Sequence, residues 1–275
     1  MQKERRKERQ KSINMDVKKL KQDKDSMRFL VKGTTAAYMN SLRRMILNRV
    51  PTMAIEEVTF IDNGSALYDE FLAHRLGMIP LITDAESYFI KSKCKCKGNG
   101  CARCELTMTL DKKGPCSVYA EDIKSADPKV KSAIPKLLIV KLLPGQNLKF
   151  EAKAILGGGK QHMKFAPGQV FYQGYPEITI DQAQAAKIKV EQCPQKILEL
   201  DGKKVKVTDE TECNLCKACQ DASPEGAIKI EGSDKDFILT IEPWGQLSAK
   251  EMVDSAITML DEDLEELKEA VKGLD

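Results

Sequence analysis

The sequence predicts an α+β protein with a β-rich middle, a small cysteine-rich module after it and a long C-terminal helix. Three observations lead there: strand-like segments fill the middle, a CxxCxxC motif follows them, and apolar residues recur with heptad spacing at the C-terminus. The 275 residues, 42% hydrophobic and 31% charged, suffice for two or three modules and are too polar for a membrane protein. A formal net charge of +3 excludes a histone-like basic binder and an acidic solvating chain.

The N-terminal segment is basic and has no apolar stretch. Met1–Ser12 holds six basic and two acidic residues, so we expect a solvated, disordered tail over 1–13, with a weak phosphate contact as the alternative. No secretory signal is expected, which predicts a cytoplasmic protein. Paired cysteines in that reducing compartment favour metal binding over disulfides.

Two short strands are expected within Asp16–Val31, followed by a helix over Ala36–Val50 that Pro51 ends. Arg43 and Arg44 lie beside the apolar stripe of that helix. The pattern alone is equally that of an ordinary helix facing a core.

The middle of the chain, 51–172, predicts a β-rich domain, because strand-like segments alternate there with Gly and Pro turns. The run Gly157–Lys160 lacks the spacing and the Ser or Thr of a phosphate-binding loop. We also find no cluster of carboxylates or nucleophiles that predicts an active site. The expected strands are Ala54–Asp62, Leu106–Leu110, Ser117–Tyr119, Leu137–Leu143 and Leu148–Leu156.

A zinc-type loop lies within this middle, at 94–104. Four cysteines within eleven residues suit one tetrahedral zinc ion, and Gly98 and Gly100 let the backbone turn around it. Because cysteines fill all four positions, a closed structural zinc site is expected. Reduced free thiols and an Fe–S site are the alternatives, and the cysteines are Cys94, Cys96, Cys101 and Cys104.

A second cysteine set follows the ligand pattern of ferredoxins. In that pattern the cysteine of a Cys-Pro pair completes the cluster held by a CxxCxxC motif, which predicts one [4Fe–4S] cluster, or [3Fe–4S] if an iron is lost. A two-cluster ferredoxin would have a twin, but its ligand positions are Ala183, Ala186, Lys189 and Ser223. A fold-stabilising or oxidation-sensing cluster is therefore favoured over an electron carrier. The expected ligands are Cys193, Cys213, Cys216 and Cys219, within a module of short strands at Ile197–Val207 and Ala227–Glu231.

The C-terminal helix carries a strict heptad seam, which indicates lengthwise packing on another helix. Its polar face is acidic, with nine acidic and three basic residues in 249–275. A partner in another chain is favoured because the helix would be about 39 Å long. Packing within the same chain is the alternative. The apolar set is Val253, Ile257, Leu260, Leu264, Leu267, Val271 and Leu274.

Two long motifs resemble the D-type subunit of archaeal DNA-directed RNA polymerase, the counterpart of the bacterial alpha N-terminal domain and of the third-largest subunit of eukaryotic polymerase II. They are Asn40–Val58 (NSLRRMILNRVPTMAIEEV) and Asp69–Leu81 (DEFLAHRLGMIPL). Val118–Ser125, Ala152–Gly168 and the ferredoxin-type cysteines agree with that family. The loop at 94–104 resembles the zinc loop of the eukaryotic counterpart, which many archaeal members of the family lack.

The resemblance implies an alpha-N-terminal-domain-like dimerisation domain at 14–50 and 236–275, a β-rich insert domain at 51–172 and a ferredoxin-like Fe–S domain at 173–235. It implies a non-catalytic assembly subunit that pairs with a small L-type subunit, and Arg43 and Arg44 would help to grip the large subunits. The heterodimer would carry the two large catalytic subunits and other small assembly subunits. DNA would be reached only through the complex, and no membrane is expected.

Two rivals come from other classes of protein. A ferredoxin-type electron-transfer protein rests on the single cluster alone. A zinc-dependent nucleic-acid binder needs a basic face, and the near-neutral charge outside the tail counts against it.

Overall fold

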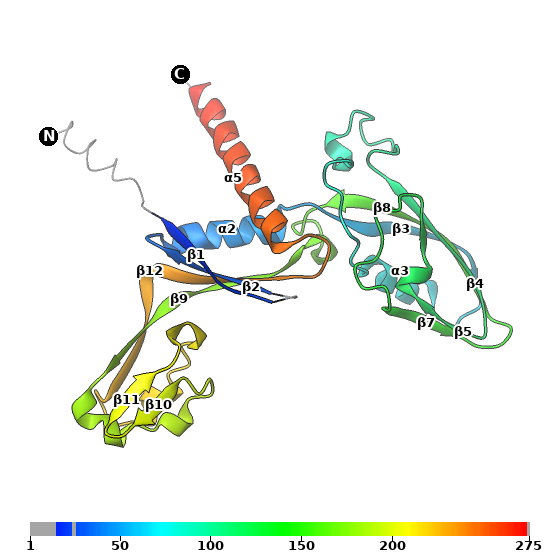
Figure 1. The fold of residues 1–275 in the computed structure, drawn as a ribbon. Coiled ribbons are helices and arrows are strands. Elements are labelled where there is room, and N and C mark those ends of the chain that lie inside the picture. Colours follow the sequence, from blue (N-terminus) through cyan, green and yellow to red (C-terminus); the bar gives the residue numbers. More distant parts are fainter. Residues whose placement is uncertain (1–14, 24–25, 274–275) are drawn as a thin grey trace. The chain divides into compact units, whose positions relative to one another are not determined.

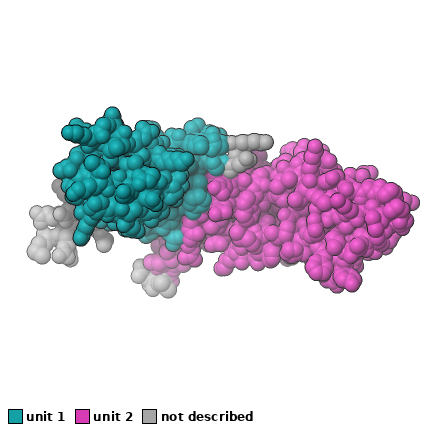
Figure 2. All heavy atoms as spheres, turned by 90° about the horizontal axis from the view of Figure 1, so that it is seen from below, with its two compact units in different colours: residues 1–41, 171–240 teal, residues 42–170, 241–275 magenta. Residues whose placement is uncertain are grey.

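The computed structural model describes residues 15–23 and 26–273, so the expected tail at 1–13 and Leu274 lie outside the described residues. The chain forms two compact units, each built from two separate segments (Figure 2). One unit holds residues 1–41 and 171–240, and the other holds residues 42–170 and 241–275. In the described ranges no helix is long and apolar enough to cross a membrane.

A four-stranded sheet with the order β1-β2-β12-β9 joins segments that are far apart in sequence (Figure 1). The strands β1 (Asp16–Gln22) and β2 (Met27–Lys32) form the expected antiparallel pair. Neither β9 (Gly168–Ile180) nor the second half of β12 (Ile228–Pro243) was predicted. The polar stretch after Glu231 has the composition of a loop, and its pairing within the sheet holds it extended.

The insert contains the five strands that its sequence predicts. A four-stranded sheet has the order β3-β8-β4-β6, and β5 pairs with β7. From Asn147 to Leu156, strand β8 alternates between buried and more exposed positions, so one face forms the core around Phe150. The bounds are β3 Thr52–Asn63, β4 Leu106–Lys113, β5 Cys116–Tyr119, β6 Lys124–Ser125, β7 Leu138–Leu142 and β8 Asn147–Gly157.

Helices add to both units. The expected helix is present as α2 (Ala36–Asn48), and α3 (Asp69–Gly77) is an addition that the sequence pattern did not predict. Leu72 and Leu76 of α3, one turn apart, are buried where the helix contacts β3 and β7. The last helix, α5 (Ala249–Lys272), begins with a Ser248/Glu251 capping box.

The small cysteine-rich region has its own core. The hairpin of β10 (Leu198–Asp201) and β11 (Lys204–Val207) turns at Gly202, as expected. Buried Ile188, Ile197 and Val205 pack there with three cysteines. The remaining helices are α4 Ala218–Asp221 and the 3₁₀ turns η1 Lys91–Lys93, η2 Ala120–Asp122, η3 Met163–Phe165, η4 Gln182–Lys187, η5 Val190–Gln192 and η6 Glu210–Glu212.

We expect Phe150→Ala to destabilise the insert by about 3–5 kcal/mol, because it removes a ring that is 1% exposed and lies edge-on to Phe60. Urea unfolding followed by far-UV circular dichroism measures the change. Phe71→Ala, which truncates a ring that is 63% exposed in the same unit, is the control and should cost less than about 0.5 kcal/mol. Equal costs for both variants would show that Phe150 is not central to this core.

Candidate metal centres

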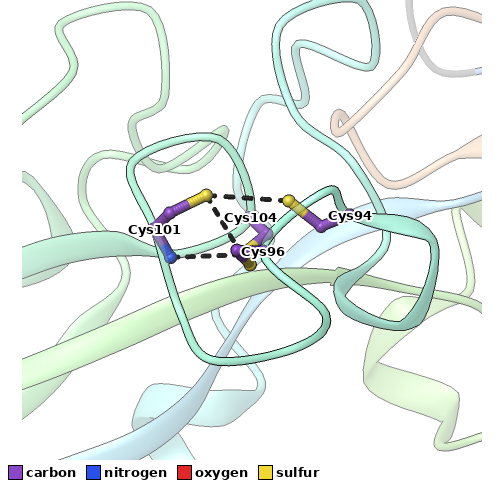
Figure 3. Close-up of side chains that lie close together, drawn as sticks. All are labelled: Cys94, Cys96, Cys101 and Cys104. Atoms are coloured by element: carbon purple, nitrogen blue, oxygen red, sulfur yellow. Dashed lines mark hydrogen bonds between the residues drawn. The ribbon is translucent and has the colours of Figure 1, made fainter.

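The four cysteines of the 94–104 loop converge on one point (Figure 3). Their sulfur atoms all lie within 4.8 Å of one another. The Cys94–Cys101, Cys96–Cys104 and Cys101–Cys104 sulfur distances are 3.6, 3.5 and 3.7 Å. Thiolates bound tetrahedrally at about 2.3 Å from zinc would stand about 3.8 Å apart, so the group has the size of a site for a single ion.

The backbone of the loop forms this group through tight turns. Lys97, Gly98 and Gly100 all have positive φ, at 55°, 84° and 83°. The amide of Lys97 donates to the carbonyl of Cys94, and the amide of Cys104 donates to that of Cys101, both at 2.9 Å. The two glycines adopt this conformation without steric cost, which confirms their expected part in the turn.

The thiols differ in how readily they ionise. A hydrogen bond with Cys94 lowers the pKa of Cys96 to about 6, whereas burial raises the pKa of Cys104 to about 12. One thiolate is therefore stabilised by its neighbours, but four thiolates together need a cation. The donor set fits a thiophilic metal ion, which would be held by all four cysteines.

Contacts at the base of the loop hold it to the insert. The ammonium group of Lys91 lies 2.5 Å from the carboxylate of Glu105, and this hydrogen bond lowers the pKa of Glu105. The amide of Phe89 donates to the carbonyl of Arg103 at 2.8 Å. The sequence pattern did not predict the pairing of Lys91 with Glu105, although their positions flank the cysteines.

The second cysteine set lies in the other unit and is looser. Cys193, Cys213 and Cys219 are buried in one apolar cluster, and Cys216 is exposed. Burial and the neighbouring charge of Cys193 both raise the pKa values of Cys213 and Cys219. In the described part of the chain, only the first set has all its ligand atoms within 4.8 Å of one another. The sulfurs that bind a cluster of several irons stand farther apart than those that share one ion.

Side chains from the central sheet fix the segment before and around Cys213. The amide of Gln173 in β9 donates to the Cys213 carbonyl at 2.7 Å, and the hydroxyl of Tyr175 donates to Glu210 at 2.9 Å. Arg28 in β2 donates to Glu212 at 2.5 Å. No spacing rule places these contacts, because they join residues more than thirty positions apart.

The loop between Cys213 and Cys219 has an unusual backbone. Leu215 and Lys217 both have a φ of 59°, although neither is glycine. Such residues cost about 1–3 kcal/mol each and persist where surrounding structure imposes them. They flank Cys216, which is exposed.

Two positions of the missing twin cluster, Lys189 and Ser223, are neighbours in space. The amide of Lys189 donates to the Ser223 hydroxyl at 3.1 Å, and that hydroxyl donates to the Cys219 carbonyl at 2.6 Å. Ser223 lies thirty residues after Cys193, and each is followed by proline. Two residues beyond these prolines, Lys196 and Gly226 both have positive φ. The strands β10 and β12 then begin, again thirty residues apart.

The apolar seam of α5 is largely exposed. Ile257, Leu264, Leu267 and Val271 are 40%, 54%, 59% and 55% exposed, and Val253 and Leu260 are half-buried. A different face, with Met252 and Ala256, is buried within the chain. On α2, Arg43 is half-buried and Arg44 is exposed.

These features define a class of protein: a two-unit α+β chain with a β-rich insert, a four-cysteine group that could hold a metal, and a long C-terminal helix whose apolar side chains are exposed. The model of the RNA polymerase Rpb3/RpoA insert domain matches residues 55–171. Similar proteins are the DNA-directed RNA polymerase subunits Rpo3 of Methanosarcina acetivorans and Archaeoglobus fulgidus. The first is 37% identical over 93% of this chain and 97% of its own length, and the second is 34% identical over 92% and 97%. Rpo3 of Pyrococcus furiosus is 35% identical over 90% of this chain and 93% of its own length.

The chain therefore belongs to the archaeal Rpo3 family of DNA-directed RNA polymerase subunits. It is part of that polymerase and serves transcription as an assembly subunit, which confirms the function expected from its motifs.

Metal binding at the 94–104 loop should weaken as pH falls. At neutral pH the raised pKa of Cys104 keeps its proton on, and binding must release it. For each proton released on binding, the apparent affinity for the metal falls about tenfold when the pH falls by one unit. Zinc titration against a chelator between about pH 8 and about pH 6 measures this effect. Cys116→Ser, which changes a thiol outside the group, should titrate like the unaltered protein. A pH-independent affinity would contradict thiolate ligation.

Proposed function

We propose that this subunit is a non-catalytic scaffold that pairs through α5 with a small L-type polymerase subunit in the cytoplasm. The pair forms the platform for the two large catalytic subunits, and Arg43 and Arg44 of α2 contact them. The observation that carries the proposal is the exposed seam of α5, because four large apolar side chains along one helix face water. A partner helix would remove them from water.

Leu260→Asp with Leu264→Asp should abolish pairing with the small subunit, because two charges would be buried in an apolar contact. A loss of at least about 3 kcal/mol, or more than a hundredfold in affinity, is expected. The measurement is an anaerobic pull-down of the tagged protein from its native cells, with the recovered chains identified by mass. The unaltered protein should recover two very large chains and one small chain.

Thr258→Asp is the control, since it adds a carboxylate to the polar side of the same helix. Retention of the small chain by the double leucine variant would show that the seam is not the contact.

We also propose that the 94–104 loop binds a structural zinc ion. Three sulfur–sulfur distances of 3.5–3.7 Å are close to those of a tetrahedral zinc site, and all four candidate ligands are cysteines. Both features favour a closed zinc site. Zinc bound there would hold the four cysteines of the loop together and would supply no chemistry to a substrate.

The second set, Cys193, Cys213, Cys216 and Cys219, is proposed to bind one [4Fe–4S] cluster in a ferredoxin-like fold. The burial of three of these cysteines and the strained turns around Cys216 support this interpretation. The repeat of structural features at thirty-residue intervals supports it further, since two-cluster ferredoxins contain their cluster motif twice. Loss of one iron would give the [3Fe–4S] form.

A fold-stabilising role for the cluster is favoured over electron transfer. None of the four ligand positions of the twin cluster is a cysteine: they are Ala183, Ala186, Lys189 and Ser223. The hydroxyl of Ser223 instead hydrogen-bonds the backbone of Lys189 and of Cys219. A two-cluster ferredoxin passes electrons between nearby centres, and this module offers one centre. The contacts from Gln173, Tyr175 and Arg28 tie the cysteine segment to the sheet, as a structural role requires.

Cys213→Ser should lower the iron and sulfide content of anaerobically prepared protein and loosen residues 173–235. Hydrogen exchange of those residues should become faster, because the ligand loop loses its crosslink. Binding of the small subunit should persist, since α5 belongs to the other compact unit. Cys116→Ser is the matched control and should retain iron. Loss of the small subunit from Cys213→Ser would contradict a modular arrangement.

A further inference from the structure

Two acidic side chains border the exposed seam of α5. In heptad terms Ile257, Leu264 and Val271 occupy a positions, and the residues after Val253, Leu260 and Leu267 occupy e positions. The first two e residues, Asp254 and Asp261, are exposed, and the third, Lys268, is paired with Glu265 at 2.9 Å. Among the described residues neither Asp254 nor Asp261 has an ion pair, whereas Asp263 pairs with Arg49 at 2.8 Å.

The faces of α5 have a fixed order around the helix. At about 100° per residue, the buried face with Met252, Ala256 and Asp263 lies about 90° from the seam. The e row with Asp254 and Asp261 lies a further 80° or so beyond the seam, on the side away from the buried face. A helix that packs on the seam must therefore meet these two carboxylates along its outer border.

We propose that Asp254 and Asp261 select the partner of α5: they favour a helix whose flanking residues are Lys or Arg and exclude a second copy of this chain. A second copy would bring another acidic helix against this one, because its α5 holds eight acidic and three basic residues within 249–273. Like charges along a seam oppose pairing, and opposite charges set the choice of partner. The inference rests on the proposed pairing through α5 and states which chemistry the partner presents.

The apolar seam alone would not discriminate in this way. Leu and Ile side chains pack as well against a copy as against another chain. Asp254 and Asp261 are therefore the feature that keeps the exposed seam from joining two identical subunits. Their repulsion acts over about 10 Å or more at low ionic strength.

The test is a charge reversal, Asp254→Lys with Asp261→Lys, in the full-length protein. Affinity for the small subunit that co-purifies with the unaltered protein should fall about tenfold at low salt, and the difference should shrink as salt is added. Glu262→Lys with Glu269→Lys is the control. It makes the same change in charge on the f positions, on the side opposite the seam, and should leave the affinity within about twofold.

Sedimentation of the unaltered protein alone provides the second readout. It should remain monomeric at low salt at micromolar concentrations. Self-association there, or equal affinities for the reversal and control variants, would overturn the proposal. Failure of the unaltered protein to bind the small subunit would instead refute the pairing proposed above.

Discussion

Strands β9 and β12 lie next to each other in the central sheet, and their pairing brings together segments that are far apart in the sequence. Close backbone approach fixes their alignment at two places: a Cβ on Gly168 would lie 2.4 Å from the Glu242 carbonyl oxygen, and one on Gly174 would lie 2.7 Å from that of Ser233. The cysteine-rich module is inserted between the end of β9 and the start of β12, and α5 follows the end of β12. A register slip of one residue would move the side chains of the slipped strand to the opposite faces of the sheet. The points at which the cysteine-rich module and α5 leave the sheet thus depend on this pairing.

The two cysteine sets obtain their order from different sources. The 94–104 loop is local, and its shape follows from two glycines and short-range backbone hydrogen bonds. The second set joins Cys193 to a motif that begins twenty residues later, so its assembly needs the intervening hairpin β10–β11 and the polar contacts of the sheet. Loss of the second site should therefore affect a larger part of the fold than loss of the first.

The same distinction explains how far the sequence could predict the structure. Local patterns sufficed for the β1–β2 pair, the five insert strands, the β10–β11 hairpin, α2 and α5, and for the convergence of Cys94, Cys96, Cys101 and Cys104. The polar half of β12 resembles a loop until its partner strand is known, and α3 is only nine residues long. The supporting contacts of Gln173 and Arg28 join distant segments, and no spacing rule could place them. The domain boundaries at 50/51, 172/173 and 235/236 remain predictions. The two compact units of the structure instead divide the chain at 41/42, 170/171 and 240/241.

Ser223 occupies a position at which the proposed ferredoxin pattern has a cluster ligand. At the position of a ferredoxin ligand, its hydroxyl accepts a hydrogen bond from Lys189 and donates one to Cys219, so it joins the segment that precedes Cys193 to the helix that carries Cys219. In the ferredoxin pattern a cysteine there would bind an iron, whereas this serine hydrogen-bonds two backbone groups. The single cluster proposed at the remaining cysteines would have no neighbouring cluster inside the module. The contacts of Gln173, Tyr175 and Arg28 connect the cysteine segment to the central sheet, which is the arrangement expected of a crosslink rather than of a redox relay.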